Sequence, residues 1–526
     1  MSTPATRSDA PDRPALEGHG SGSGEKGLRI GALGLFSSVS IGLASAAPAY
    51  SLAATLGLIV AGVGLQAPII TILAFIPMLL IAYAYKEMNA VDPDCGTTFT
   101  WAARAFGPRT GWMGGWGIIV ADVIVMANLA QIAGGYTFQL LGLDSLAAST
   151  LWTTVAGVVW IALMTLICYI GIEVSAALQR VMLVGEVVML VLFSGTALVR
   201  AYTDAKGSIH LSLSWFNPFD VASASAFTAG ILSAIFIYWG WDTAVSVNEE
   251  TADKTRTPGR AAVISTGLLL LIYALVSTSA QAFAGVGDKG NGLANPGNSA
   301  DVLSVLGGAV FGTSGIGWLL AKLFILTVLT SAAASTQTTI LPTARTAFSM
   351  AAHKAIPSHF GRVHKRFQTP TWATVGMGLA SIAFYVLLTR ISTNVLTDSI
   401  SSVGLAIAFY YGLTGLACAW YFRKVLGRSA RDLWLKGVLP GLGSVMLLYF
   451  FCYAAFDVYA DPGYGYTAIS LPGLGRVGGV TVIGIASLLL GLLLMAIQRV
   501  AQGSWFRSPD VPTGPHTPDP TAAPVA

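Results

Sequence analysis

Charged residues are scarce in this sequence. Lys, Arg, Asp and Glu together make up 10% of its 526 residues, whereas hydrophobic residues make up 54%. A globular protein carries about 25% charged residues and needs them on its surface, so a set of soluble domains is excluded. A disordered chain is excluded for the same reason. The basic residues are scattered along the chain, which argues against a nucleic-acid partner, because such binding gathers them on one face. The composition predicts a polytopic membrane protein whose surroundings are the lipid bilayer.

Motifs of catalysis and of nucleotide binding are also missing. The sequence has no Walker-type loop, no HExxH and no dinucleotide-binding fingerprint. None of its four cysteines stands at a metal-ligand spacing, and its six histidines all fall in expected loops or tails. We therefore expect no cofactor, no metal and no enzyme activity, and ATP-driven transport by this chain alone is disfavoured. If protons cross the membrane through this chain, their carrier is a carboxylate or a lysine.

Long apolar runs are plentiful. Each is near or above the roughly 20 residues that a membrane-spanning helix needs. Because lipid leaves every backbone N–H and C=O to be satisfied internally, we expect helices rather than strands, and an all-α fold. Residues 1–28 and the Pro-rich residues 501–526 are predicted to be disordered tails around a twelve-helix domain over 29–500. The expected spans cover residues 31–58, 65–85, 111–141, 151–171, 176–201, 225–247, 261–285, 314–345, 371–389, 396–421, 435–456 and 476–498.

Lys and Arg predict the orientation of these spans, because basic residues concentrate in cytoplasmic loops. With the N-terminus inside, most of the 29 basic residues fall in cytoplasmic segments. We therefore expect a protein of the cell membrane with both termini in the cytoplasm. The basic residues that then fall outside are Arg200, Lys206, Lys289, Arg390 and Arg476, and Lys322 falls within a span.

Two of the predicted spans contain residues that interrupt helices. In the first span, residues 40–48 (SIGLASAAP) are a run of small residues that ends in a proline. In the sixth span, residues 236–242 (FIYWGWD) place a glycine and an acid in mid-membrane. Small-residue packing and an aromatic contact stripe are the ordinary explanations for each. Two such breaks five spans apart instead match the paired broken helices of secondary transporters, which hold their substrate at the midplane.

A second correspondence indicates that residues 31–202 and residues 225–421 form two repeats of inverted topology. The loop after the second span contains an amphipathic stretch over residues 97–107, and the loop after the seventh contains another over residues 298–312. With an odd number of spans between them, these loops lie on opposite faces of the membrane, as inverted topology requires.

At this point the residues resemble a known family, the amino acid–polyamine–organocation (APC) permeases, over most of residues 30–425. The break in the first span departs from the family pattern, with IGLAS in place of the usual G-S-G, and Asp94-Cys95-Gly96 replaces P-x-G-G. The matching stretches are Asp94–Thr97 leading to Phe106–Trp112, Phe236–Asp242, Asn248–Glu250 followed by Thr257–Arg260, and Ala344-Arg345 through Ile356-Pro357 to Gln368–Pro370.

The resemblance implies the 5+5 inverted-repeat fold of the leucine-transporter type, with two extra C-terminal helices. It also implies where an amino acid would bind. Free N–H groups after the first break suit a carboxylate, and free carbonyls before the second suit an ammonium group. Tyr238, Trp239 and Trp241 would line the side-chain pocket or close over the substrate, with Gly240 at the break. The N–H groups are expected at Gly42, Leu43, Ala44 and Ser45, and the carbonyls at Phe236, Ile237 and Tyr238.

Four charges are expected near the centre of the bilayer, where each costs roughly 2.5 to 3.5 kcal/mol and so usually has a partner or a function. They are candidates for coupling or gating. Asp122 lies in span three and Lys322 in span eight, and these spans are equivalent in the repeat. The sequence therefore allows an ion pair between Asp122 and Lys322. The four are Asp122, Glu186, Asp242 and Lys322.

Glu186 is the sharpest of these candidates, because the resemblance places it near the first break and span eight. Three roles stay open for it: a proton carrier, a sodium ligand together with Ser331 or Ser335, or a structural acid bonded to the broken helix. Asp242 resembles the acidic gate residue of the family. Two roles stay open for it: gating or proton sensing, and simple helix capping.

Two further acids, Glu249 and Glu250, follow the sixth span among Lys254, Arg256 and Arg260. We expect them to be solvated or to form an inner-gate salt bridge rather than to contact substrate.

The resulting hypothesis is an amino acid permease that imports its substrate with protons by alternating access. The alternatives are an exchanger of amino acids or amines and a sodium-coupled symporter. The expected partner is a small amino acid or related amine, together with a proton or sodium.

Overall fold

The computed structural model describes residues 26–203, 207–298, 301–391, 395–462, 467–473, 475–501 and 503–507. The predicted disorder of residues 1–25 and 508–526 lies outside the described residues. The end of the predicted C-terminal tail nearest the bundle, Gly503–Arg507, forms a short helix, α19, whose Trp505 is buried.

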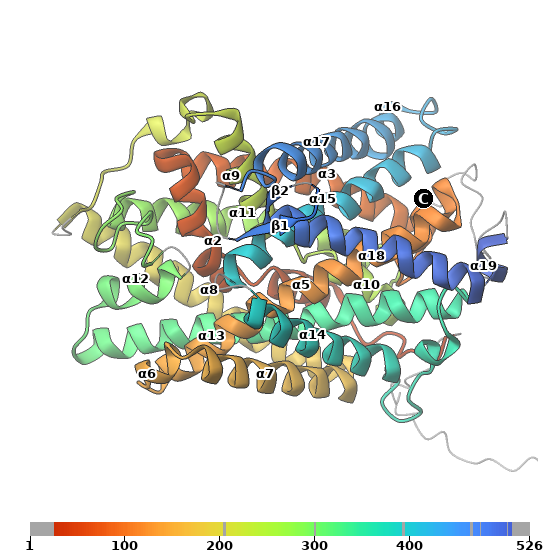
Figure 1. Cartoon of the computed structure of the whole chain (residues 1–526), viewed down its shortest axis with the longest axis horizontal. Coiled ribbons are helices and arrows are strands. Elements are labelled where there is room, and N and C mark those ends of the chain that lie inside the picture. The colour runs from red at the N-terminus through yellow and green to blue at the C-terminus, as the bar shows by residue number, and fades with distance from the viewer. Residues whose placement is uncertain are drawn as a thin grey trace, which may run out of the picture.

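Long helices build the molecule and run mostly along its longest axis (Figure 1). They are α1 (Leu35–Ala46), α2 (Pro48–Val63), α3 (Ala67–Val91), α5 (Pro108–Leu140), α7 (Thr150–Ile170), α8 (Ile172–Thr203), α9 (Ala224–Tyr238), α11 (Thr257–Ala284), α13 (Gly315–Ala352), α14 (Thr371–Ile391), α15 (Val395–Tyr421), α17 (Leu439–Tyr453) and α18 (Gly479–Ala501). In Figure 1, α7 lies along one side of the bundle and α17 along the opposite side.

Shorter elements connect them. The short α-helices are α4 (Thr98–Phe106), α6 (Asp144–Ala147), α10 (Thr243–Ser246), α12 (Val302–Phe311) and α16 (Ala430–Asp432). The 3₁₀ turns are η1 (Gly64–Gln66), η2 (Leu213–Phe216), η3 (Pro218–Asp220), η4 (Asn248–Glu250) and η5 (Ser358–Gly361), and the π-helical turns are η6 (Leu433–Val438) and η7 (Ala454–Val458). One antiparallel hairpin, β1 (Ala468–Leu471) with β2 (Gly475–Gly478), joins α17 to α18 and pairs Ala468 with Gly478.

Ten helical stretches among the described residues are long and apolar enough to cross a membrane, so the chain is an all-α polytopic membrane protein. The first stretch, Leu35–Val91, contains two of the predicted spans, separated by η1. The sixth predicted span is divided into α9 and α10. Its longer part, α9, is an apolar helix of 15 residues and is too short to be among the ten. The count of twelve and the 5+5 arrangement remain predictions. Both amphipathic stretches expected in equivalent loops contain a helix, α4 in one and α12 in the other.

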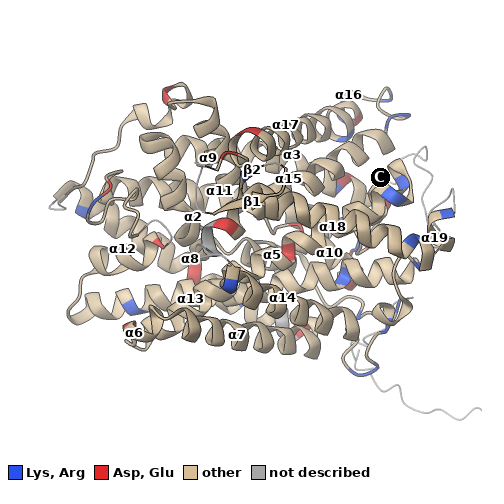
Figure 2. Cartoon of the chain, in the orientation of Figure 1, with Lys and Arg blue, Asp and Glu red and all other residues tan. Residues whose placement is uncertain are grey.

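Lys and Arg gather toward the end of the bundle that carries α16 and α19 (Figure 2). The face formed by this end is the one that the sequence predicts to be cytoplasmic, and it is called the basic face below.

Small residues set the distances between the central helices. The α5 helix packs against α7 and α13. A Cβ atom added to Gly134 of α5 would lie 2.2 Å from the backbone oxygen of Thr153 in α7, so an alanine there must push the helices apart. Close helix approach through glycine is how membrane helices gain van der Waals packing without a hydrophobic driving force.

This packing yields a matched pair of substitutions. Gly134→Ala should destabilise the protein by about 1–3 kcal/mol, the usual range for overpacking a core. Gly135→Ala is the control, because a Cβ at Gly135 meets nothing within 4 Å. Thermal unfolding of the two purified variants in detergent provides the measurement, and equal melting temperatures would contradict the packing argument.

Candidate functional site

The first broken helix is interrupted at a single residue. Ala47 adopts left-handed backbone angles (φ 47°, ψ 69°) between α1 and α2, and Pro48 opens α2. The cause is local, because proline disfavours helical angles in the residue before it and has no N–H to continue the ladder. The predicted position of the break needs correction, because the expected carboxylate-binding residues lie before it, inside α1: Gly42, Leu43, Ala44 and Ser45.

The second break lies between α9 and α10 and is wider. The α9 helix ends at Tyr238, Trp239 is extended, and Gly240 has φ 110°, an angle that favours glycine. Trp241 and Asp242 then lead into α10 at Thr243. The predicted interruption at residues 236–242 therefore falls where the sequence placed it.

The two breaks touch each other. A Cβ atom on Gly240 would lie 2.8 Å from the carbonyl carbon of Ser45, and one on Gly42 would lie 3.3 Å from the Trp241 oxygen. The hydroxyls of Ser45 and Thr243 are 2.9 Å apart and share a hydrogen bond. The residues named from the two halves of the sequence thus converge on one buried place.

Hydroxyl side chains satisfy most of the backbone oxygens that the breaks expose. The hydroxyl of Tyr273 in α11 donates to the Ile237 oxygen, and that of Ser335 in α13 donates to the Ser45 oxygen at 3.0 Å. The Phe236 oxygen accepts from the Trp239 N–H at 3.1 Å. Two of the three carbonyls expected to be free for an ammonium group are therefore occupied in this conformation. No feature of the sequence singled out Tyr273, because a tyrosine in an apolar span is ordinary.

Glu186 of α8 binds the start of α2. Its Oε1 accepts hydrogen bonds from the Ala49 N–H and from the Ser331 hydroxyl of α13, both at 2.7 Å. Ser331 in turn accepts from the Tyr50 N–H at 3.2 Å. Glu186 is buried, and no Lys or Arg in the described part of the chain forms a salt bridge with it. The carboxylate therefore lies where the N–H groups and dipole of a helix start attract an anion.

Asp242 lies in a shell of aromatic side chains. Its Oδ2 accepts a hydrogen bond from the Tyr410 hydroxyl at 3.0 Å, and the Trp239 indole N–H donates to the same hydroxyl. The rings of Tyr85, Trp241 and Tyr411 pack on one another beside it, with centroids 5.2 to 5.7 Å apart.

Two buried polar atoms at the second break lack a partner. These are the Trp241 indole nitrogen and the Tyr238 hydroxyl, for which the described residues supply no hydrogen bond. An unpaired buried donor is unfavourable unless another molecule completes it.

The ion pair between Asp122 and Lys322 that the sequence left open does not form, because the two side chains have separate partners. Asp122, in mid-α5, accepts a hydrogen bond from the Thr343 hydroxyl of α13. Lys322 lies near the opposite end of α13, where its ammonium donates to the Gln139 oxygen at 2.8 Å at the end of α5. Lys322 thus caps a helix C-terminus, a favourable place for a cation.

A buried ion pair joins α13 to η4, the turn that follows the second break along the chain. The Arg345 guanidinium and the Glu250 carboxylate are 3.0 Å apart and at most 1% exposed. Burial raises the pKa of Glu250, while Arg345 opposes that rise. The sequence analysis left a solvated role or a salt bridge open for Glu250, and the structure shows a salt bridge whose partner comes from α13, far along the chain.

A second ionic cluster surrounds Lys26. Its ammonium lies 2.8 Å from Asp94 and 2.7 Å from Glu249, so Glu249 also forms a salt bridge. Burial alone would raise the pKa of Asp94, but Lys26, His353 and a hydrogen bond from Ser349 hold it below its ordinary value.

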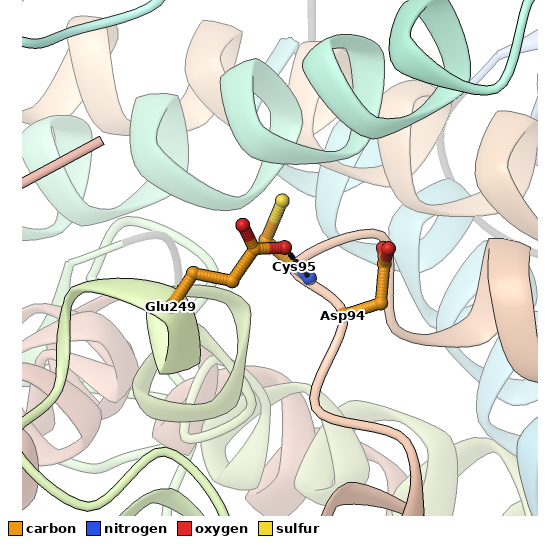
Figure 3. Close-up of side chains that lie close together, drawn as sticks. All are labelled: Asp94, Cys95 and Glu249. Carbon is orange, nitrogen blue, oxygen red and sulfur yellow. Dashed lines mark hydrogen bonds between the residues drawn. The ribbon is translucent and has the colours of Figure 1, made fainter. Parts of the chain in front are cut away.

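Figure 3 shows Asp94, Cys95 and Glu249 close together, a grouping of metal-ligand type. The Glu249 carboxylate accepts from the Cys95 N–H at 3.0 Å. The Lys26 ammonium bonds to both carboxylates of the group, so a protein cation already lies between the two acids and compensates one of their two negative charges.

These features define a polytopic membrane protein with two broken helices in contact at its centre. The chain belongs to the amino acid permease family of the APC superfamily, whose sequence profile it matches over residues 33–497.

Three relatives illustrate the range of the family. Cationic amino acid transporter 3, mitochondrial, of Arabidopsis thaliana is 24% identical over 64% of this chain, which spans about half (54%) of that relative's length. An uncharacterized transporter of Mycobacterium tuberculosis is 27% identical, with 79% of this chain and 85% of the relative covered. An arginine/ornithine antiporter of Lactococcus lactis subsp. cremoris is 21% identical, with 75% and 77% covered.

The burial of the Arg345–Glu250 pair gives a prediction. Glu250→Gln should destabilise the protein by about 3–5 kcal/mol, because it leaves a buried guanidinium without a counter-charge. The control is Glu173→Gln, which removes the partner of Arg29 from an exposed pair (37% and 48% exposed) and should change stability by at most about 1 kcal/mol. Thermal unfolding in detergent measures both, and equal losses would refute the distinction.

Proposed function

We propose that this permease imports an amino acid together with protons by alternating access across the cell membrane. The observation that carries the proposal is the carboxylate of Glu186 on the start of α2, held by Ala49 and Ser331. This arrangement brings a titratable group, a broken helix and the neighbouring helix α13 into contact at one point. The family membership supports amino acids as the substrate.

The coupling follows from competition for the same backbone donors. The N–H groups at the start of a broken helix are the natural ligands of a substrate carboxylate. Here the Ala49 N–H is taken by ionised Glu186, and the Tyr50 N–H by Ser331. Protonation of Glu186 removes its charge, weakens its hold on the Ala49 N–H and frees that donor for the substrate. Proton and amino acid therefore bind together.

The remaining parts of the substrate would be recognised at the second break. We propose that the ammonium group meets the oxygens of residues 236–238 after Tyr273 rotates away, with Ser45 and the other predicted residues of α1, Gly42, Leu43 and Ala44, packed behind it. Trp239, Gly240 and Trp241 form the adjoining wall. The buried Tyr238 hydroxyl and Trp241 indole, which lack partners among the described residues, supply further donors.

Sodium coupling is the alternative at the same place. Ser331 contacts Glu186, whereas Ser335 donates to the Ser45 oxygen at 3.0 Å. Exchange is the other alternative, because several relatives are named antiporters.

Glu186→Gln should abolish uptake driven by a pH gradient and leave amino acid counterflow intact, since a glutamine keeps the shape of the side chain but carries no proton across. Labelled uptake into proteoliposomes, with and without an imposed pH gradient, measures the first property. Counterflow into amino acid-loaded vesicles measures the second.

Ser335→Ala is the comparison variant, because it removes the other candidate sodium ligand and leaves the carboxylate in place. Undiminished pH-driven uptake by Glu186→Gln would remove Glu186 from coupling. Uptake that requires sodium in the wild type, or that occurs only against internal substrate, would favour the symporter or the exchanger.

The acids near the second break favour a cationic substrate. Asp122 and Asp242 are both buried, and each accepts a hydrogen bond from a neutral hydroxyl, of Thr343 and Tyr410 respectively. Aromatic faces beside carboxylates attract a guanidinium or ammonium group. Relatives named cationic amino acid transporters agree with this choice.

Asp122→Asn should therefore lower kcat/KM for arginine or lysine uptake by about tenfold, the loss of one charge-assisted hydrogen bond. Uptake of a neutral amino acid should change little. Asp301→Asn is the control, because that acid is partly buried at the start of α12 and bonds to Tyr136 and the Ser304 N–H rather than to either break. An equal loss for cationic and neutral substrates would reject a side-chain role for Asp122.

A further inference from the structure

Three arginines line one cavity at the basic face. Arg109 is the second residue of α5, Arg499 lies in the last turn of α18, and Arg507 ends α19. The cavity has a volume of about 580 Å³, and its apolar wall includes Met495, Val500 and Phe506. Three elements that are far apart in the sequence thus bring three positive charges to one hollow.

In the part of the chain that the structure describes, no carboxylate pairs with this group of charges. Among the described residues, none of the three guanidinium groups forms a salt bridge, whereas Lys26, Arg345 and Lys436 at the same face each have an acidic partner. Arg109 also lies at the start of a 33-residue helix, whose dipole adds positive potential there. The local field therefore favours an anion with several oxygen atoms, such as a phosphate, which arginine binds bidentately.

The neighbouring surface indicates that the phosphate belongs to a lipid. Along α18, Leu493, Ile497 and Val500 are 58%, 52% and 89% exposed. Exposed apolar side chains on a membrane helix face acyl chains, and they lead directly to the arginines. A free phosphate would gain nothing from such a wall. Anionic lipids are enriched in the cytoplasmic leaflet, the side to which the sequence assigns this face.

We propose that Arg109, Arg499 and Arg507 bind the headgroup phosphate of an anionic phospholipid whose acyl chains lie along α18. Such a lipid would tie α18 and α19 to the start of α5. The link extends further, because the Trp505 ring of α19 stacks on Phe99 of α4 at 5.1 Å and meets His353 at 5.9 Å. Bound lipid would therefore stabilise the closed arrangement of the basic face, independently of the transported substrate.

The test uses the purified full-length chain in nanodiscs of phosphatidylcholine with a small fraction of phosphatidylglycerol. Native mass spectrometry counts retained lipids, and the melting temperature is followed as phosphatidylglycerol is added. The wild type should retain phosphatidylglycerol and gain stability. Each single Arg→Gln substitution should weaken retention about five-fold, and the triple variant R109Q/R499Q/R507Q should lose the stabilisation.

The matched control is R362Q/K424Q/R431Q, which removes three positive charges from other loops of the same face and should keep both effects. Retention by the triple arginine variant equal to that of the control would overturn the proposal, as would equal retention of phosphatidylcholine. Inorganic phosphate is added separately. If it stabilises the wild type as strongly as phosphatidylglycerol and displaces that lipid, the cavity is a site for a free anion and the lipid assignment fails.

Discussion

The contact between the two broken helices is the constraint on which the rest of the structure depends. A helix that stops inside a membrane exposes backbone groups that lipid cannot satisfy. Here the two breaks pack directly against each other, with Gly240 against Ser45 and the Ser45 hydroxyl bonded to Thr243. Hydroxyls of Tyr273 and Ser335 satisfy exposed backbone oxygens by donating to those of Ile237 and Ser45. Movement of either break would therefore separate these groups and leave polar atoms that another ligand must then satisfy.

Glu186 extends this argument from structure to energy coupling. A carboxylate on the start of α2 satisfies the exposed N–H groups, but it also occupies the place that suits a substrate carboxylate. In the proposed mechanism, the unoccupied state is favoured when Glu186 is ionised, and the substrate-bound state is favoured when it is protonated. The Arg345–Glu250 pair and the Lys26 cluster are ion pairs, and in the proposed transport cycle they would hold the basic face closed. A carrier needs this combination, because an open path at both faces would dissipate the gradient.

The sequence predicted the fold class, the family and the existence of both breaks, because apolar runs, a proline and a glycine act locally. It also placed Glu186 near the first break and Ser331. It misplaced the residues of the first break, because small residues such as Gly42 and Ser45 suit both a break and a tightly packed helix, and only Ala47 leaves the helical region.

Interaction partners that lie far apart in the sequence could not be predicted, because helix packing decides which side chains meet. The bonds of Glu250 to Arg345 and of Lys322 to the end of α5 depend on how the helices pack. Charge patterns reveal which residues need a partner, but they do not reveal which partner the packing supplies.

Calorimetry of amino acid binding, repeated in buffers of different ionisation enthalpy, tests the central claim most directly, because it counts the protons exchanged on binding. The wild type should take up a proton as the amino acid displaces Glu186 from α2, and Glu186→Gln should bind the amino acid without proton uptake. Binding by the wild type with no proton uptake, or the same uptake in both proteins, would contradict the account.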